Sequence, residues 1–284
     1  MERKVLGMAA NKEKAPYSVM SYFCGCGGLD LGFRGGFKYH DEDYPALPFN
    51  IIEAYDNEPR CIETYNDYFG TGHALVKDLA AVKPEEIPKA DILIGGFPCQ
   101  EFSSCGPLGG LESERGRLYQ TLIAYMNTHK PKIVVGENVI NLERMEKGEV
   151  LKTIKKNLMA AGYTVKVWKM FAPDYGVPQR RTRLMIMCVR KDLFEEYGFP
   201  KEPEASVYKG YKRDKIEMRG NRAEISDFPL YLNTVAGGLD RRDQTIGGFS
   251  FVVKIYALPV VEIIGQLLYL PGRYSFNAQF GDCL

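Results

Sequence analysis

Short apolar runs and longer segments with helical spacing alternate along the first two thirds of the chain. The runs predict buried strands at residues 18–22, 51–55, 92–95, 132–136, 163–171 and 184–189. Between them, apolar side chains recur at helical spacing at 118–126 and 150–158, and another predicted helix extends to residue 68. Strands and helices that alternate at these lengths predict an α/β fold built on a mostly parallel, doubly wound sheet.

This rhythm divides the chain into three parts. Residues 1–17 are polar and charged and predict a flexible arm, whereas residues 18–199 form the predicted α/β domain. Residues 200–284 lack the alternation and end with an apolar stretch at 249–270. This last part is therefore predicted to be a smaller, separate C-terminal segment.

Composition narrows the class of protein. The formal net charge is +1, so any nucleic-acid surface must be local. Seven irregularly spaced cysteines indicate reduced thiols in a cytosolic compartment, and the three histidines lack zinc spacing. No apolar run has the length of a membrane span or a secretion signal. We therefore expect neither a metal nor a membrane partner.

Two predicted strands deliver reactive side chains. Cys99 follows the strand at 92–95 after a Gly-Pro break, and Glu137 follows the strand at 132–136. Because parallel strands place their chemistry at their carboxyl ends, the thiol and the carboxyl group are expected at one edge of the sheet. This pair suits covalent attack on a ring that must also be protonated. Taken alone, the cysteine is more often a small buried apolar residue, and the glutamate is equally a helix cap or a surface group.

A glycine-rich turn and two acids indicate a nucleoside cofactor. Gly25, Gly27 and Gly28 follow the first strand, where backbone amides can approach a ligand. Asp56 ends the next strand, the place where ribose hydroxyls are bound in dinucleotide folds, and Asp78 ends the one after it. A glycine-rich turn alone is as often merely tight, so the acids carry this prediction.

Basic residues at 179–183 precede the strand at 184–189. Arg181 and Arg183 alternate onto one face and would point toward the edge that holds Cys99 and Glu137. Guanidinium groups there suit a base carbonyl or a phosphate. The alternative is a solvated, charged turn.

Five ordered motifs resemble those of bacterial DNA cytosine-5 methyltransferases of the restriction-modification type. They are Phe23-x-Gly25-x-Gly27-Gly28, Pro98-Cys99-Gln100, Arg115-Gly116-x-Leu118-Tyr119, Glu137-Asn138-Val139 and Gln179-x-Arg181-x-Arg183. The resemblance covers about residues 18–192. It implies a Rossmann-like S-adenosylmethionine-dependent methyltransferase fold with a smaller C-terminal recognition segment. The implied activity is methylation of C5 of a cytosine flipped out of double-stranded DNA, through a Cys99–C6 adduct.

The resemblance also assigns roles. Glu137 would donate to N3 of the ring and Arg183 would hold O2, while Asp56 would bind the cofactor ribose and Asp78 the adenine amino group. The implied catalytic residues are Cys99, Glu137, Arg181 and Arg183. Those implied for S-adenosylmethionine and its product S-adenosylhomocysteine are Phe23, Gly25, Cys26, Gly27, Gly28, Asp56, Asn57, Asp78, Leu79, Gly96, Pro98 and Leu118. Gln100, Ser103 and Arg115 would contact DNA.

Two departures from the family pattern stand out. Asn57 replaces a common bulky aromatic residue, and the last two family motifs are not found, since residues 276–279 lack the Gly-Asn pair. Residues 200–284 are therefore predicted to be a partial target-recognition or partner-binding region. The chain would be half of a split enzyme completed by a second polypeptide, a truncated product, or a divergent enzyme.

Two other functions remain open. The tRNA-directed branch shares the catalytic residues, but it usually has a second Pro before Pro-Cys and a Cys-Phe-Thr segment. Here Phe97 precedes Pro98 and no such segment exists, which favours DNA. A non-catalytic DNA-binding or regulatory subunit would be expected to lack Cys99, Glu137 or Arg183, and all three are present. The implied location is the cytoplasm of a bacterium or archaeon, at the nucleoid.

Overall fold

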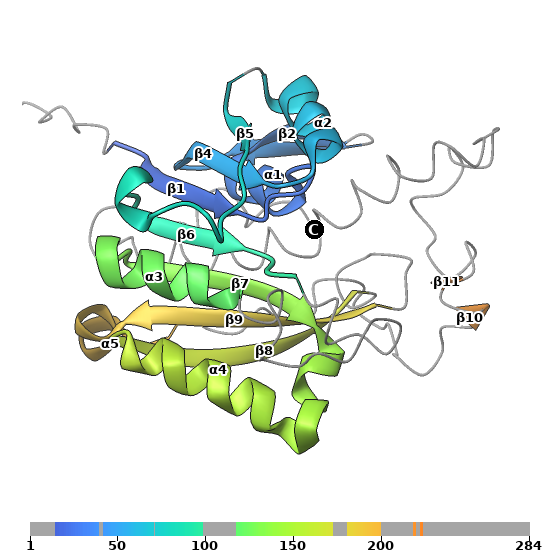
Figure 1. Ribbon diagram of the computed structural model, residues 1–284. Helices are drawn as coiled ribbons and strands as arrows, with labels where there is room; N and C mark the ends of the chain where they lie inside the picture. Colours follow the sequence, from blue (N-terminus) through green and yellow to red (C-terminus); the bar gives the residue numbers. More distant parts are fainter. Residues whose placement is uncertain are drawn as a thin grey trace, which may run out of the picture.

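A seven-stranded sheet forms the centre of the computed structural model, which describes residues 15–39, 42–70, 72–98, 118–172, 181–199, 218–219 and 222–223 (Figure 1). The strand order is β5-β4-β1-β6-β7-β9-β8. The strands are β1 (Tyr17–Tyr22), β4 (Phe49–Asp56), β5 (Ala74–Val76), β6 (Ile92–Gly95), β7 (Ile133–Val139), β8 (Tyr163–Phe171) and β9 (Thr182–Arg190). The predicted mostly parallel sheet is confirmed, but β9 runs antiparallel to both β7 and β8, which the sequence analysis did not predict.

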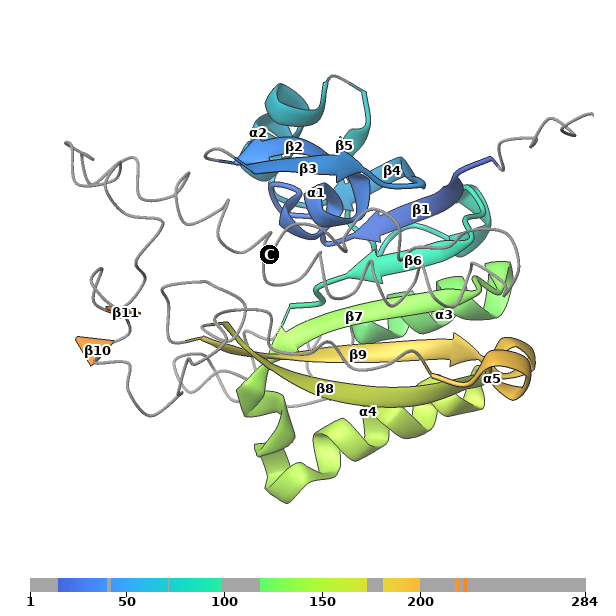
Figure 2. The same ribbon diagram turned by 180° about the vertical axis from the view of Figure 1, so that it is seen from behind.

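Helices cover both faces of the sheet and create two apolar cores (Figures 1 and 2). On one face, α1 (Gly28–Arg34), α2 (Pro59–Phe69) and α5 (Lys191–Tyr197) pack with alternate side chains of the strands. On the other, α3 (Tyr119–His129) and α4 (Glu149–Ala160) pack on the remaining ones. Short 3-10 helices occupy Pro84–Glu86, Ile140–Glu143 and Met145–Gly148. Since both faces are covered, the central strands are apolar throughout, as parallel strands usually are.

Two small antiparallel pairs lie outside this sheet. β2 (Gly35–Tyr39) pairs with β3 (Glu42–Ala46), and β10 (Met218–Arg219) pairs with β11 (Arg222–Ala223). Neither pair was predicted from the sequence, and for β2 and β3 the reason is that residues 35–46 are rich in glycine and charge and give a weak strand signal. The predicted boundary near residue 199 stays a prediction.

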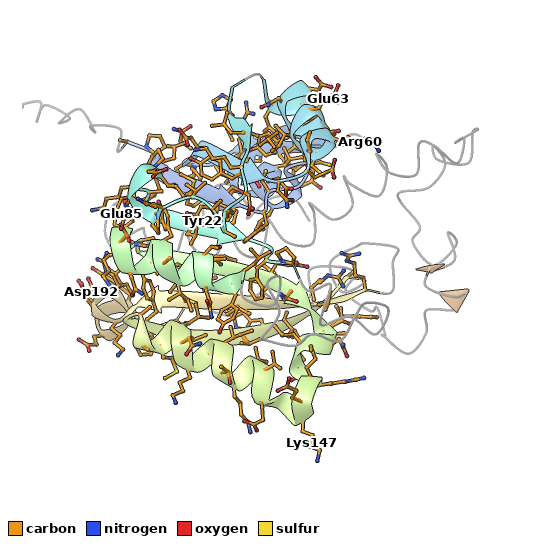
Figure 3. The ribbon with its side chains drawn as sticks, in the orientation of Figure 1. Tyr22, Arg60, Glu63, Glu85, Lys147 and Asp192 are labelled. Carbon is orange, nitrogen blue, oxygen red and sulfur yellow. The ribbon has the colours of Figure 1, made fainter. Side chains whose placement is uncertain are left out.

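The strand order reverses between β1 and β6, and this reversal marks the expected ligand site. In the register of the sheet, Tyr22 at the end of β1 lies beside Gly95 at the end of β6, which lies beside Gly136. The segments that follow β1, β6 and β7 therefore meet at one edge. Crevices at such switch points are where open α/β sheets bind ligands. Tyr22 lies in the interior, whereas Arg60, Glu63, Glu85, Lys147 and Asp192 project at the periphery (Figure 3).

Two findings on the described residues concern membranes and metals. None of its helices is both long and apolar enough to cross a membrane. Within the same residues, no group of three or more His, Cys, Asp or Glu side chains is arranged to hold a metal ion.

Candidate active site

The glycine-rich turn after β1 has a backbone that few residues other than glycine adopt. Gly25 has φ 52° and Gly27 has φ 89°, and Phe23 also has a positive φ of 53°. A Cβ atom built on Gly27 would lie 2.4 Å from a ring carbon of Phe69, so this side of the turn packs directly on α2. Among the residues that the structure describes, a Cβ on Gly25 would meet nothing within 4 Å. The turn is thus closed toward α2 and open at Gly25, where a ligand can approach the backbone.

Asp56, the predicted ribose ligand, fixes this turn in the structure. Its Oδ2 accepts a hydrogen bond from the backbone N–H of Gly25 at 2.9 Å, and its Oδ1 accepts one from Glu58 at 3.0 Å. A carboxylate has about four lone-pair sites, so both oxygens retain room for further donors. Asn57 beside it is exposed. The acid therefore connects the end of β4 to the glycine turn while remaining able to accept hydroxyl groups.

Two thiols meet at this turn. Cys26 is partly buried and interacts with Cys61 of α2. Burial chiefly, and then the neighbouring Cys26 thiol, raises the pKa of Cys61 to about 12. Gly28, the last glycine of the motif, is buried as the first residue of α1. Cys26 and Gly28 thus continue the turn from Gly25 into the helix.

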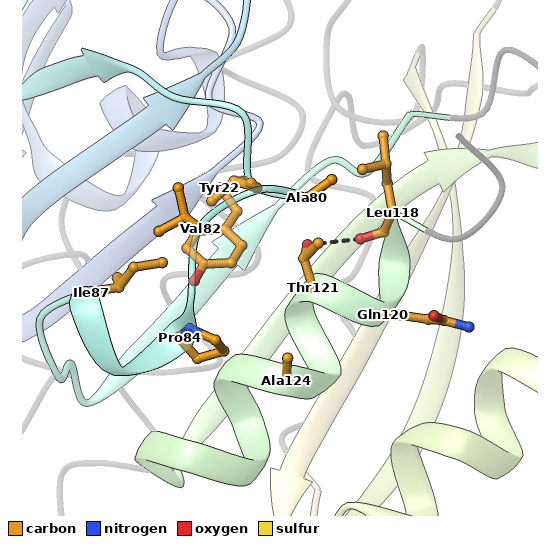
Figure 4. Close-up of a pocket in the computed structure, with 10 residues that line it drawn as sticks. Tyr22, Ala80, Val82, Pro84, Ile87, Leu118, Gln120, Thr121 and Ala124 are labelled. Atoms are coloured by element: carbon orange, nitrogen blue, oxygen red, sulfur yellow. Dashed lines mark hydrogen bonds between the residues drawn. The ribbon is translucent and has the colours of Figure 1, made fainter. Parts of the chain in front are cut away.

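A hollow of about 560 Å³ lies between the segment that follows β5 and the start of α3, with Tyr22 at the end of β1 on its wall (Figure 4). Leu79 and Leu118, both predicted cofactor contacts, line it together with Tyr22 and Thr121, which the sequence analysis did not single out. The hydroxyl of Thr121 donates to the carbonyl of Leu118 at 2.7 Å. Apolar walls with a few polar groups are typical of a small-molecule site. Asp78 is exposed just before Leu79, and its Oδ1 accepts from the backbone of Ala80 at 3.0 Å.

Glu137 and Arg183 form the charged centre of the site. Glu137 lies in β7 and Arg183 near the start of β9, and the Oε1 atom of Glu137 is 2.8 Å from Nε of Arg183. The side chains are 22% and 15% exposed, so the pair is largely but not wholly removed from water. The meeting of these two groups at one edge of the sheet is seen in the structure, and their chemical roles stay predictions. Their meeting depends on the reversed direction of β9, which places its first residues beside the end of β7.

The segment that leads into Cys99 is held against this pair. A Cβ on Gly96 would lie 3.2 Å from Oε2 of Glu137, a tight contact, so Gly96 lets the backbone pass close to the carboxylate. The side-chain amide of Asn138 donates to the carbonyl of Phe97 at 3.2 Å, and Asn138 is only 1% exposed. Pro98 is partly buried. Asn138 belongs to a predicted motif but had no predicted role, and it anchors the residues just before Cys99.

The other predicted site residues divide into two groups. Cys99, Gln100, Ser103 and Arg115 lie outside the described residues, so their predicted roles stay predictions. Arg181 is partly buried at the start of β9, and its carbonyl accepts from the backbone of Ala172 at 2.8 Å. Its Nε is buried and, within the described part of the chain, has no hydrogen-bond partner.

The residues around the turn fit a nucleoside cofactor with a charged tail. The open side at Gly25, the carboxylate of Asp56 and the hollow beside Leu79 lie along the switch point of the sheet. Together with the strand order and its single reversed strand, they define the Rossmann-like fold of S-adenosylmethionine-dependent methyltransferases. A prophage-encoded DNA modification methyltransferase from E. coli, as its crystal structure is described, matches at a TM-score of 0.50 with 25% identity. The match covers 62% of this chain and 47% of that one.

The sequence places the chain within one family of this class. A family model described as C-5 cytosine-specific DNA methylase matches residues 17–231, and the chain belongs to that family. It is 36% identical over 201 residues to the type II methyltransferase M.BspRI of Lysinibacillus sphaericus, a match that covers 65% of this chain and 47% of that protein. It is 36% identical over 200 residues to M.FnuDI of Fusobacterium nucleatum, with 70% and 54% covered. The chain thus spans about half the length of these curated relatives.

Proposed function

We propose that this protein transfers a methyl group to C5 of a cytosine that is flipped out of double-stranded DNA. The Glu137–Arg183 pair carries the proposal, because it lies next to the end of β6, beside Gly96 and the segment that leads into Cys99. S-adenosylmethionine supplies the methyl group when bound, and leaves as S-adenosylhomocysteine. Membership in the cytosine-specific family supports both the reaction and the DNA substrate.

The chain's own residues supply the remaining chemistry. The Cys99 thiolate adds to C6 of the ring and forms a covalent bond, while Glu137 hydrogen-bonds or protonates N3 so that the ring accepts the electron pair. C5 then takes the methyl group, loses its proton to a base, and the returning electron pair expels Cys99. Arg183 orients Glu137 and holds O2 of the base. Asn138 keeps the Cys99 segment in place by its bond to Phe97.

The cofactor residues divide the ligand among themselves. Gly25, Cys26, Gly27 and Gly28 face the methionine part, Asp56 accepts from the ribose, and Phe23, Asn57, Asp78 and Leu79 surround the adenine, with Gly96, Pro98 and Leu118 nearby. Leu79 and Leu118 on the wall of the hollow support this division. Gln100, Ser103, Arg115 and Arg181 would contact DNA or the flipped base, and the protein would act at the nucleoid in the cytoplasm.

The first test is transfer of labelled methyl groups from S-adenosylmethionine to unmethylated genomic DNA by this chain alone. We expect incorporation into cytosine that is lost in Cys99→Ala, and no incorporation into tRNA tested in parallel. Trapping of the enzyme on DNA that contains 5-fluorocytosine would identify the Cys99 adduct, because the fluorine cannot leave as a proton does.

Three outcomes distinguish a single-chain enzyme, a two-chain enzyme and an enzyme that acts on tRNA. Activity of this chain alone would remove the need for a second polypeptide. Activity only after addition of the product of an adjacent reading frame would establish a two-chain enzyme, which stays a prediction. Labelling of tRNA rather than DNA would contradict the proposed substrate.

A further inference from the structure

A buried acid next to the cofactor turn has no part in the proposed chemistry. Asp30 lies in the first turn of α1 and is 0% exposed, and among the described residues no other Asp or Glu is buried. Its Oδ2 accepts from the hydroxyl of Ser21 and its Oδ1 from the hydroxyl of Tyr65, both at 3.0 Å. The carboxylate thus connects three elements, since Ser21 belongs to β1 and Tyr65 to α2.

The buried negative charge of Asp30 lowers the stability of the folded state. Burial raises the pKa of Asp30 to about 6, and the hydrogen bonds from Ser21 and Tyr65 offset only part of that effect. No basic side chain of the described residues is among the groups that perturb it. A buried carboxylate without a cation is stabilised less than a neutral group would be in the same place. Fold stability alone therefore gives little reason for a charge here.

The geometry of the glycine turn supplies a reason. The turn runs from β1 to α1, and the ring of Tyr65 lies under it: a Cβ on Gly27 would come 2.8 Å from that ring. Tyr65 therefore both supports Gly27 and donates to Asp30. Because Ser21 lies just before the turn and Asp30 just after it, one carboxylate holds the two ends of the turn and its support together.

The groups that face this carboxylate come from every element around it. Ser21 approaches from β1, Tyr65 from α2 and Cys24 from the turn itself, and Arg34 at the end of α1 acts on Tyr65. Burial first, and then the nearby Asp30 and Asp56 carboxylates, raise the pKa of Cys24, so both acids act on this residue of the turn. Asp56 fixes the turn at Gly25, and Asp30 fixes it beyond Gly27.

We propose that Asp30, through Ser21 and Tyr65, is a positioning residue that holds the glycine turn in the conformation that binds S-adenosylmethionine. This inference rests on the proposed function. An ionised carboxylate accepts from both hydroxyls at once, one on each oxygen, whereas an amide offers one oxygen acceptor and one NH2 donor, so one of the two hydroxyls would have to reverse its role and accept. Loss of either bond would let the turn relax away from α2 without opening the core. The consequence is weaker cofactor binding with a folded protein.

The experiment measures the affinity of the full chain for S-adenosylhomocysteine by calorimetry in Asp30→Asn and Tyr65→Phe. We expect each variant to bind S-adenosylhomocysteine about tenfold more weakly, which corresponds to a loss of about 1.4 kcal/mol in binding free energy. The matched controls are Asp67→Asn and Tyr68→Phe, which change exposed residues of α2 and should bind as the wild type does. Near-ultraviolet circular dichroism and denaturant unfolding test whether each variant is folded.

A second readout separates positioning from mere stability. In methyl transfer, the two variants should raise KM for S-adenosylmethionine about tenfold and leave kcat within twofold at saturating cofactor. Unchanged affinity in both variants, or a fall in kcat with KM unchanged, would overturn the role of Asp30. If the wild type itself fails to bind the cofactor, the proposed function fails instead, so the two failures are distinguishable.

Discussion

The two halves of the sheet build their parts of the site by different means. On the β4–β1 side, two carboxylates fix the glycine turn. Asp56 accepts from the backbone N–H of Gly25, and Asp30 accepts from the hydroxyl of Ser21 just before the turn. On the β7–β9 side, the site consists of side chains, and its centre is the ion pair between Glu137 and Arg183. One half is built around fixed main-chain geometry, the other around charges that a ligand can rearrange.

This difference matches what each half would have to do. A cofactor of constant structure is best met by a turn that is already in place, because no ordering is then needed on binding. A flipped base must enter between groups that respond to its changing charge, and charged groups that are largely removed from water interact strongly with such a charge. Changes on the two sides should therefore affect different measurements.

The largest effect is expected on the β7–β9 side. Glu137→Gln keeps the shape of the side chain but removes its acidity and half of the ion pair. We expect kcat to fall by about 10²–10⁴-fold, the usual contribution of a general acid. Affinity for S-adenosylhomocysteine should stay within about twofold of the wild type. Methyl transfer and calorimetry measure the two quantities.

Glu143→Gln is the matched control for that variant. Glu143 follows the same strand and pairs with Lys169 at 2.7 Å on the surface. Its replacement should leave both kcat and cofactor affinity near those of the wild type. An equal loss of kcat in both variants would mean that the Glu137 effect is not specific to the site.

The next effect concerns the glycine turn. Gly27→Ala would combine an unfavourable φ of 89° with a Cβ 2.4 Å from Phe69, and we expect the free energy of unfolding to fall by about 2–4 kcal/mol. Gly25→Ala shares the positive φ, but its Cβ would meet none of the described residues within 4 Å, so about 1–2 kcal/mol is expected. Urea unfolding of the two variants isolates the contact with α2. Equal losses would show that the turn does not pack there.

The buried acid predicts a pH dependence with a defined sign. Because the pKa of Asp30 is raised to about 6 from 3.8, the folded protein binds this proton more tightly than the unfolded chain does. Its contribution to stability is therefore fully present below about pH 4 and is lost as the pH rises through about 6, by about 3 kcal/mol in all. Asp30→Asn should accordingly gain stability relative to the wild type between pH 4 and pH 7. A constant difference across this range would contradict the raised pKa.

The smallest effect is expected at Asn138. Asn138→Ala removes the hydrogen bond to Phe97 and leaves a buried carbonyl without this donor, at a cost of about 1–2 kcal/mol in the free energy of unfolding. We expect a larger relative loss in kcat than in cofactor affinity, because Phe97 lies two residues before Cys99. Thermal unfolding and steady-state kinetics test this. Unaltered kcat would show that the Cys99 segment is positioned by other contacts.

Much of this arrangement is predictable from sequence, for physical reasons. Apolar runs such as residues 92–95 are buried on both faces of the sheet, so they identify central strands directly. The glycines that follow the first strand identify the turn at residues 25–28. The placement of Glu137 follows from the rule that parallel strands end at one edge. The reversal of β9 was missed, although ten residues between β8 and β9 are too few for a crossover helix and indicate antiparallel neighbours.

Side-chain pairing was harder to predict than the strands. The contact of Glu137 with Arg183 depends on which strands are neighbours, and strand order is not encoded in local periodicity. Asp30 gave one usable signal: a charged residue surrounded by Leu29, Leu31 and Phe33 in a short helix is expected to be buried with a partner. Its partner Tyr65 lies on a different helix, which the sequence pattern alone does not connect.

The position of β9 between β7 and β8 also has a consequence for biosynthesis. During translation, β8 is completed before the strand that joins it to β7 exists, so a nascent chain carries two unpaired strand edges at that stage. Only when β9 has left the ribosome can it insert between them and bring Arg183 to Glu137. The β7–β9 half of the site is thus assembled by the last strand of the sheet to be made, after the glycine turn has had time to form.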